Sequence, residues 1–355
     1  MKILVYGAGA VGGYLGGRLA QHGHDVTLIT RKVTADFINQ RGLDITEKEE
    51  TITSYPKAVL SVAQAFADNA TYDLIIMSMK SYDLETAIDP LVAFCPDPPL
   101  IISTQNGIDV ERPLTEQFGE EKVISGSVTT PIRRETSYHL VVERADRGLA
   151  LSALHKSQNI KQWTTIFNNA GIKTTRVKNY ASMKWSKAFL NIVGNASAAI
   201  LSRKPGTIYK LDPLFDAEMK MLRETVAVMQ ARNIKMIDLP GSPATKLALA
   251  LKMPRALTKP ILTKQVSSGR GDKMPSFYYD LQNDKGKTEV IYHNGAIAAA
   301  GKALGIATPV NAAYNDLLVA LINHEEKWAD YNGKPKALLK VIRHYEAELG
   351  KTLEN

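Results

Sequence analysis

The sequence has only one cysteine, Cys95, among 355 residues. A single thiol has no intramolecular partner, which excludes a disulfide-stabilised scaffold, and it cannot supply a cysteine-rich zinc or iron–sulfur site. The 7 histidines do not show a metal-ligand spacing such as H-E-x-x-H. We therefore predict that the protein holds no metal ion.

Long hydrophobic runs are also missing. A membrane-spanning helix needs about 18 or more apolar residues, and the longest candidate, 188–201, is interrupted by Asn191 and Asn195. The amino-terminal residues lack the cleavage pattern of a signal peptide. Because 45% of the residues are hydrophobic, the chain has the composition of a folded protein. We expect a soluble, cytoplasmic protein with no membrane partner.

The positive charge is concentrated in one segment. Lys and Arg exceed Asp and Glu by 44 to 36, and residues 242–275 contain seven basic residues against the single acidic Asp272. This segment has no aromatic residue, unlike typical nucleic-acid-binding surfaces, so we expect no nucleic-acid partner. Its prolines predict at best a broken helix over 239–275. Two interpretations are open: a solvated basic loop, or a rim that attracts an anionic ligand.

Short apolar runs alternate with helical periodicity in the first half of the chain. This alternation predicts a mainly parallel sheet covered by helices. Helical periodicity dominates from about Tyr180, so we predict an α/β domain over 1–179 and an all-helical domain over 180–355. The predicted strands are 2–6, 25–30, 73–79, 100–103, 123–128 and 173–177, with a hairpin of 139–143 and 149–151. The predicted helices are 11–22, 83–94, 181–201, 211–232, 287–304, 311–324 and 336–349.

A glycine-rich turn joins the first predicted strand to the first predicted helix. It matches G-x-G-x-x-G in the context of a Rossmann-type dinucleotide site, in which the first glycine permits a tight turn, the second lets a pyrophosphate approach and the third allows close packing. Free N–H groups at the start of the helix would face the pyrophosphate. The residues of this turn are Gly7, Ala8, Gly9, Ala10, Val11 and Gly12.

Polar residues follow three of the predicted strands. An NAD-preferring protein usually has an acidic residue after the second strand, whereas this chain has Arg31, which suits the 2′-phosphate of NADPH. Lys80 and the Gln105-Asn106-Gly107 triplet follow two later strands. Because ligands bind at the carboxyl ends of parallel strands, Lys80 and Asn106 are candidate contacts for cofactor or substrate, although ordinary turn chemistry is an equal alternative.

Lys187, Asn191 and Asn195 are spaced i, i+4 and i+8, which predicts one face of a single helix. Their neighbours are apolar, and polar side chains in such surroundings need partners, which a small polar ligand would provide. The alternative is a solvent-exposed polar stripe.

Taken together, these motifs resemble the ketopantoate reductases (2-dehydropantoate 2-reductases) from Lys2 to about Leu321. The resemblance implies a Rossmann domain coupled to a helical domain, and NADPH-dependent reduction of a 2-keto acid. It rests on the glycine turn, Arg31, Lys80, the Q-N-G triplet, W-S-K-A-F-L-N-I-V-G-N from Trp185, P-S-F-Y-Y-D-L from Pro275, T-E-V-I-Y-H-N-G from Thr288 and G-I-A-T-P-V-N from Gly305.

The resemblance also implies roles for individual residues. Hydride transfer to a ketone produces an alkoxide, which needs a cationic proton donor, and Lys187 matches the family's catalytic lysine. Glu289 matches the glutamate expected to orient that ammonium. The residues that match substrate-binding positions are Asn106, Asn191, Asn195 and Ser276.

The implied reaction is the reduction of 2-dehydropantoate to pantoate in pantothenate biosynthesis, or of a closely related anionic keto acid. Two alternatives are open: a dehydrogenase of the β-hydroxyacid type, which also places a lysine and an asparagine four residues apart, and a non-catalytic NADPH-binding sensor. A homodimer is compatible with the sequence, which does not determine the oligomeric state.

Overall fold

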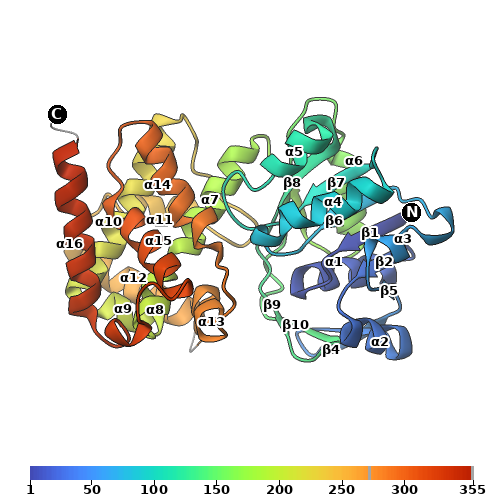
Figure 1. Cartoon of the computed structure of the whole chain (residues 1–355), viewed down its shortest axis with the longest axis horizontal. Coiled ribbons are helices and arrows are strands. Elements are labelled where there is room, and N and C mark those ends of the chain that lie inside the picture. Colours follow the sequence, from blue (N-terminus) through green and yellow to red (C-terminus); the bar gives the residue numbers. More distant parts are fainter. Residues whose placement is uncertain (271–272, 353–355) are drawn as a thin grey trace. The chain divides into compact units, whose positions relative to one another are not determined.

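A computed structural model describes residues 1–270 and 273–352 (Figure 1). The chain divides into two compact units. The first contains residues 1–106, 110–183 and 238–242, and the second contains residues 107–109, 184–237 and the described part of 243–355.

The first unit is built on an eight-stranded sheet with the order β12-β11-β8-β7-β6-β1-β2-β5. Neighbouring strands are parallel except for the antiparallel pair β8 and β11. The strands are β1 (Lys2–Tyr6), β2 (Asp25–Ile29), β5 (Lys57–Val59), β6 (Leu74–Met77), β7 (Leu100–Ser103), β8 (Val123–Val128), β11 (Leu149–Ala153) and β12 (Thr174–Arg176). The predicted Rossmann-type α/β fold is therefore confirmed.

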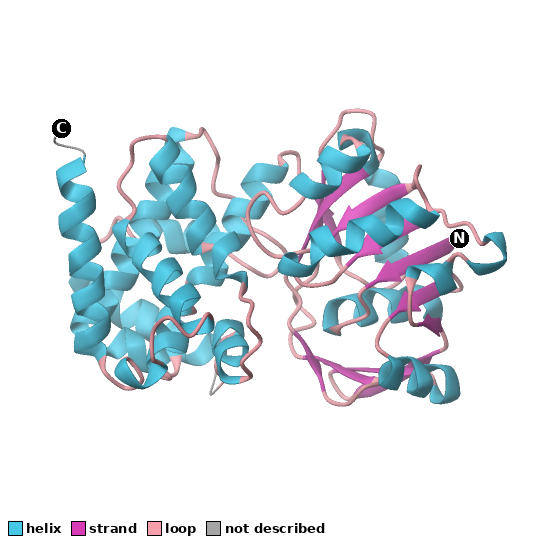
Figure 2. Ribbon diagram, in the orientation of Figure 1, coloured by secondary structure: helices cyan, strands magenta, loops and turns pink. Residues whose placement is uncertain are grey.

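Helices cover both faces of this sheet (Figures 1 and 2). Alternate side chains of a strand point to opposite faces, so Ile3 and Val5 of β1 enter one core and Leu4 enters the other. The first core is closed by α1 (Ala10–Gln21), α2 (Lys32–Arg41) and α6 (Ile160–Asn169). The second is closed by α3 (Val62–Ala65), α4 (Leu84–Phe94) and α5 (Arg112–Phe118).

A second, four-stranded sheet with the order β4-β3-β10-β9 was not expected. It consists of β3 (Leu43–Glu47), β4 (Glu50–Ser54), β9 (Ile132–Arg134) and β10 (His139–Val142). The predicted hairpin of 139–143 and 149–151 is wrong, because β10 pairs with β3 and β9, whereas β11 pairs with β8 and β12. Leu140 and Val142 of β10 are buried in the same core as Leu149 and Leu151 of β11, although the two strands pair in different sheets.

The second unit is helical, as predicted. Its central helix, α10 (Asp212–Ala231), packs against α9 (Pro205–Lys210), α14 (Asn294–Ala303), α15 (Pro309–Ile322) and α16 (Pro335–Thr352). The remaining helices are α7 (Tyr180–Ile192), which begins in the first unit, α8 (Ala196–Leu201), α11 (Ala244–Ala250), α12 (Arg255–Arg270), α13 (Ser276–Gln282) and the 3₁₀ turns η4 (Glu289–Tyr292) and η5 (Trp328–Asp330).

Two predicted helices need correction. The helix expected over 181–201 ends at Ile192 and restarts at Ala196, because Gly194 has φ +56. The helix expected over 287–304 begins as η4, and α14 follows it. The proline-rich segment is a broken helix, as predicted: α11 ends at Ala250 and α12 begins at Arg255, directly after Pro254, although α12 itself runs through Pro260. None of the described helices is both long and apolar enough to cross a membrane.

Candidate functional site

The glycine turn between β1 and α1 packs tightly on one side and is open on the other. A Cβ on Gly7, which has φ +93, would lie 2.6 Å from the Met79 backbone nitrogen, and one on Gly12 would lie 2.5 Å from the Gly7 carbonyl oxygen. A Cβ on Gly9 would meet nothing closer than that same oxygen at 4.0 Å. Gly7 and Gly12 therefore serve packing, while Gly9 faces open space that a ligand can enter.

The start of α1 presents unused hydrogen-bond donors beside this space. Gly9 is the N-cap and has no side chain to cap the helix. Across the described chain, the backbone N–H groups of Ala10, Val11 and Gly12 donate to no backbone carbonyl. Such N–H groups together with the helix dipole bind anions, so the turn has the chemistry of a pyrophosphate site.

Two arginines lie near the turn. The backbone N–H groups of Gly7 and Ala8 donate to the Ile29 carbonyl at the end of β2, at 3.2 and 3.0 Å, and Arg31 follows as the exposed N-cap of α2. Arg134 of β9 donates from Nη2 to the Ala8 carbonyl at 2.6 Å. Sequence reasoning missed Arg134, because its strand belongs to the unexpected second sheet.

The ends of β6 and β7 bring Lys80 and Asn106 into one region of the first unit. Lys80 precedes a 3₁₀ turn (Ser81–Asp83), and the Ser81 hydroxyl donates to the Asn106 carbonyl at 2.6 Å. Gln105 points into the fold, where its Oε1 accepts a hydrogen bond from Ser103 at 2.7 Å. Of the Q-N-G amides, Asn106 is thus the candidate for ligand contact.

In the second unit, Asn195 connects two elements of the predicted substrate site. Its Nδ2 donates to the Asn191 carbonyl at 3.2 Å, and its Oδ1 accepts from the Phe277 N–H at 3.4 Å. The expectation that Asn195 continues the helix face of Lys187 and Asn191 is wrong, because α7 ends at Ile192 and Asn195 is the N-cap of α8. The turn between α7 and α8 nevertheless keeps the Asn195 side chain in contact with the Asn191 carbonyl.

Ser276 and Glu289 lie in different surroundings. Ser276 is the exposed first residue of α13. The next residue, Phe277, donates its backbone N–H to Asn195. Glu289 is the first residue of η4 and is only 3% exposed. Lys187 is half-buried on α7, whereas Lys184, one turn earlier, is 2% exposed.

The carboxylate of Glu218, on α10, is a buried centre of hydrogen bonds that sequence reasoning missed. It is fully buried and accepts from the Gly194 N–H and the Ser197 hydroxyl, each at 2.7 Å. The hydroxyls of Tyr209 and Tyr314 also donate to it, each at 3.3 Å. Burial raises the pKa of Glu218, while these hydrogen bonds act in the opposite direction.

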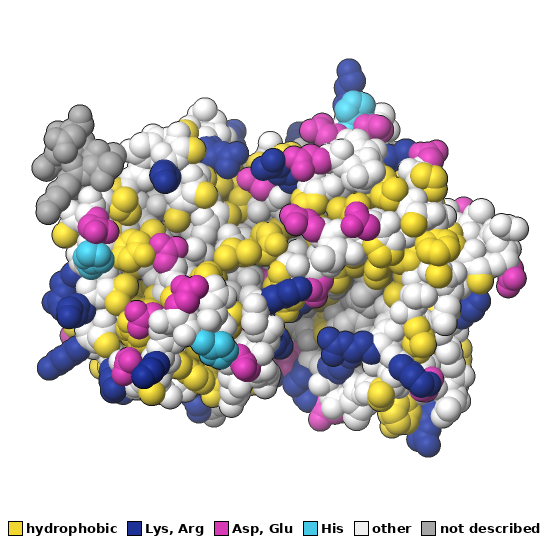
Figure 3. Space-filling model, in the orientation of Figure 1, with side chains coloured by type: hydrophobic (Ala, Val, Ile, Leu, Met, Phe, Trp, Pro, Cys, Tyr) yellow, Lys and Arg dark blue, Asp and Glu magenta, His cyan; other side chains and the backbone are white. Residues whose placement is uncertain are grey.

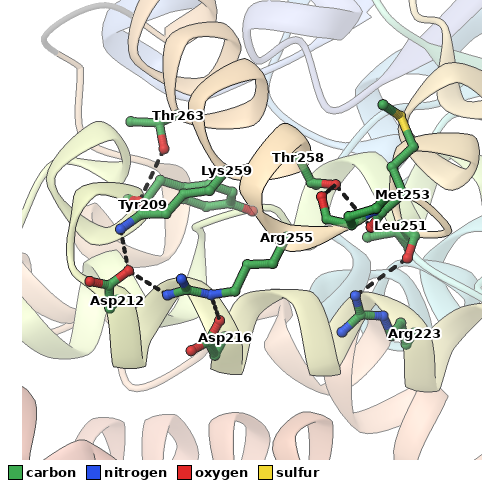
Figure 4. A network of polar contacts seen from close by, with 11 residues as sticks. Tyr209, Asp212, Asp216, Arg223, Leu251, Met253, Arg255, Thr258, Lys259 and Thr263 are labelled. Atoms are coloured by element: carbon green, nitrogen blue, oxygen red, sulfur yellow. Dashed lines mark hydrogen bonds and ion pairs between the residues drawn. The ribbon is translucent and has the colours of Figure 1, made fainter.

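The basic segment over 242–275 is partly neutralised by α10 (Figure 4). Arg255 forms ion pairs with Asp212 and Asp216, the latter at 2.7 Å, and Lys259 also pairs with Asp212. The interpretation of the basic segment as a loop is wrong for Arg255 and Lys259, since both residues lie on α12. Asp272 and the side chain of Arg270 lie outside what the structure describes. On the face shown in Figure 3, acidic and basic side chains are interspersed.

The sheet order, the glycine turn and the open α1 N-terminus define the first unit as a Rossmann-type dinucleotide-binding fold. The chain matches the family described as "Ketopantoate reductase PanE/ApbA" over residues 3–154 and its C-terminal counterpart over 179–323. The protein therefore belongs to the ketopantoate reductase family.

Individual relatives agree with this assignment. A 2-dehydropantoate 2-reductase from Pyrococcus horikoshii is 31% identical over 92% of this chain and 98% of the relative. The solved ketopantoate reductase of Ralstonia eutropha JMP134 has a TM-score of 0.76 and 24% identity, over 92% of this chain and 99% of that one. A D-mandelate dehydrogenase solved with NADH and anilino(oxo)acetate has a TM-score of 0.75 and 22% identity, over 91% and 99% of the two chains. These two structures support the fold.

Proposed function

We propose that the protein is an NADPH-dependent reductase that converts 2-dehydropantoate, or a closely related 2-keto acid, to the 2-hydroxy acid. The observation that carries the proposal is the pair of contacts made by Asn195, which hold Asn191 and the start of α13 beside one another. Asn191, Asn195 and Ser276, which match the family's substrate positions, thereby gather in one region of a family member. The name of the Pyrococcus horikoshii relative supports the same reaction.

The residues of the first unit fit a nicotinamide dinucleotide. Gly9 leaves room for the pyrophosphate, the first N–H groups of α1 donate to it, and Arg31 suits the 2′-phosphate. Lys80 and Asn106 extend the site at the ends of β6 and β7. When bound, NADPH supplies the hydride that the carbonyl carbon accepts.

Lys187 supplies the proton that the carbonyl oxygen needs when the carbon accepts the hydride. As the carbonyl oxygen gains negative charge, the Lys187 ammonium stabilises it and transfers a proton to it, which yields the hydroxyl of the product. Asn191, Asn195, Ser276 and Asn106 hold the carboxylate and the hydroxyl of the substrate. We assign Glu289 the task of keeping the ammonium charged and oriented, because a buried carboxylate favours a cationic partner.

Oxidation of NADPH, followed by absorbance with a panel of 2-keto acids, tests the proposal. We expect turnover with 2-dehydropantoate and slower turnover with 2-keto acids that lack its hydroxymethyl group. NAD-dependent oxidation of 3-hydroxy acids would instead favour a dehydrogenase of the β-hydroxyacid type. Tight NADPH binding without turnover of any keto acid would favour a sensor.

A further inference from the structure

The four-stranded sheet places the guanidinium group of Arg134 beside the glycine turn. Arg134 is the last residue of β9, a strand paired antiparallel with β10, and its Nη2 donates to the Ala8 carbonyl at 2.6 Å. Because the Ala8 N–H donates to the Ile29 carbonyl at 3.0 Å, the same residue also contacts the end of β2. Arg134 is therefore held near the point where the chain leaves β2 toward Arg31.

The two arginines lie close enough to influence each other. Burial, and then the positive charge of Arg31, lower the pKa of Arg134. Within the described chain, neither guanidinium forms an ion pair with a carboxylate. Two like charges in proximity repel each other, and an anion held between them would remove that repulsion.

The neighbouring Arg133, on the opposite face of β9, differs from Arg134 in having acidic partners. Adjacent residues of a strand point to opposite faces. Arg133 forms ion pairs with Glu135 and, at 3.4 Å, with Glu143, so its charge is already compensated. Arg134 uses one of its five N–H donors on Ala8, and the remaining donors are available for a ligand.

We propose that Arg134 shares the recognition of the 2′-phosphate of NADPH with Arg31 and so determines cofactor specificity. A phosphate monoester is nearly doubly charged at neutral pH and has three acceptor oxygens, which suits two guanidinium groups from separate elements. The inference rests on the proposed use of NADPH, and it adds a residue from β9 that lies 103 positions beyond Arg31 in the sequence.

Direct binding tests this inference without any keto acid. NADPH and NADH are titrated separately against the parent protein and its Arg134→Ala and Arg133→Ala variants, and binding is followed by the fluorescence of the reduced nicotinamide. Loss of a charge-assisted hydrogen bond should raise the Kd for NADPH by about 10- to 150-fold in Arg134→Ala. The Kd for NADH should stay within about twofold, which would also show that the glycine turn is intact. Arg133→Ala should leave both constants near their parent values.

Several results would overturn the inference. If Arg134→Ala weakened the binding of NADPH and of NADH equally, the side chain would act at the pyrophosphate or on the turn. An unchanged Kd for NADPH would show that Arg134 does not contact the cofactor. Failure to reduce keto acids, with selective loss of NADPH affinity in Arg134→Ala, would refute the proposed reaction alone. A parent protein that does not prefer NADPH would refute both the assigned cofactor and the role of Arg134.

Discussion

The carboxylate of Glu218 accepts a hydrogen bond from the backbone N–H of Gly194 at 2.7 Å. Gly194 has φ +56, lies between α7 and α8, and immediately precedes Asn195. The same carboxylate accepts from the Ser197 hydroxyl, also at 2.7 Å. A buried side chain of α10 thus holds the Gly194 backbone on one side of Asn195 and the Ser197 side chain on the other, and hence the position from which Asn195 contacts Asn191 and α13.

Replacing Glu218 should therefore affect substrate binding more than cofactor binding. Glu218→Leu roughly keeps the volume but removes both acceptor oxygens, which leaves the buried Gly194 N–H without its partner and should destabilise the fold by about 1–3 kcal/mol. We expect KM for the keto acid to rise about tenfold, with the Kd for NADPH unchanged. Thermal unfolding and steady-state kinetics measure both effects. Asp216→Asn, an exposed change on the same helix, is the control, and equal kinetics in the two variants would refute the positioning role.

Glu224 predicts a pH dependence of stability. Burial is the largest cause that raises its pKa from 4.5 to about 7, although it accepts hydrogen bonds from the N–H groups of Val310 and Asn311, each at 3.0 Å. The folded state therefore binds the proton of the Glu224 carboxyl more tightly than the unfolded state does. The resulting contribution to stability is complete below about pH 4.5 and is lost as pH rises toward 7. The loss should amount to about 3 kcal/mol.

Urea unfolding between pH 4.5 and 8 measures this contribution. The parent should lose more free energy of unfolding across that range than Glu224→Gln, whose amide does not titrate. Parallel stability profiles for the two proteins would show that Glu224 does not hold a proton in the folded state.

The local part of the fold could be predicted from the sequence. The glycine turn joins a strand and a helix that are adjacent in the chain, so its existence follows from neighbouring residues, although it also packs against Met79 and bonds to Ile29, at the ends of later strands. The second sheet could not be predicted, because β3 pairs with β10, with Asp44 opposite His139. A period-two pattern shows which side of a strand is buried, but it does not identify the partner strand. Arg134 was missed for the same reason.

The candidate site shows the same division between local and distant information. The spacing of Lys187 and Asn191 correctly placed both on α7. A continuous helix to Asn195 was wrong, and the signal was Gly194, since a glycine within a helical pattern often marks a helix end. Glu218 gave a weaker signal, a carboxylate in an amphipathic helix, because its donors on α8, α9 and α15 come from distant segments.

Cofactor preference should follow Arg31. Arg31→Glu places a negative charge beside the 2′-phosphate of NADPH, which NADH lacks. We expect the affinity for NADPH to fall by at least about 10- to 150-fold, the value of a lost charge-assisted hydrogen bond, with a much smaller change for NADH. Fluorescence titration measures both. Arg41→Glu, at the opposite end of α2, reproduces the charge change away from the turn and should alter neither affinity.

Lys187 carries the proposed proton transfer, and its removal should act on the chemical step. A ketone oxygen is a poor base until hydride transfer begins, so the ammonium matters most in the transition state. Lys187→Ala should lower kcat by about 10²–10⁴-fold, while the Kd for NADPH stays near the parent value. The alkaline decline of activity in the parent should vanish in this variant, because the titrating acid is gone.

The choice of control for Lys187 depends on burial. Lys184 is one turn earlier but only 2% exposed, so its removal would disturb the packing of α7 and confuse loss of folding with loss of catalysis. Lys210, exposed at the end of α9, provides a lysine-to-alanine change without that cost. Lys210→Ala should retain kcat and the alkaline decline. Unimpaired turnover in Lys187→Ala would remove this lysine from the reaction and require a different proton donor.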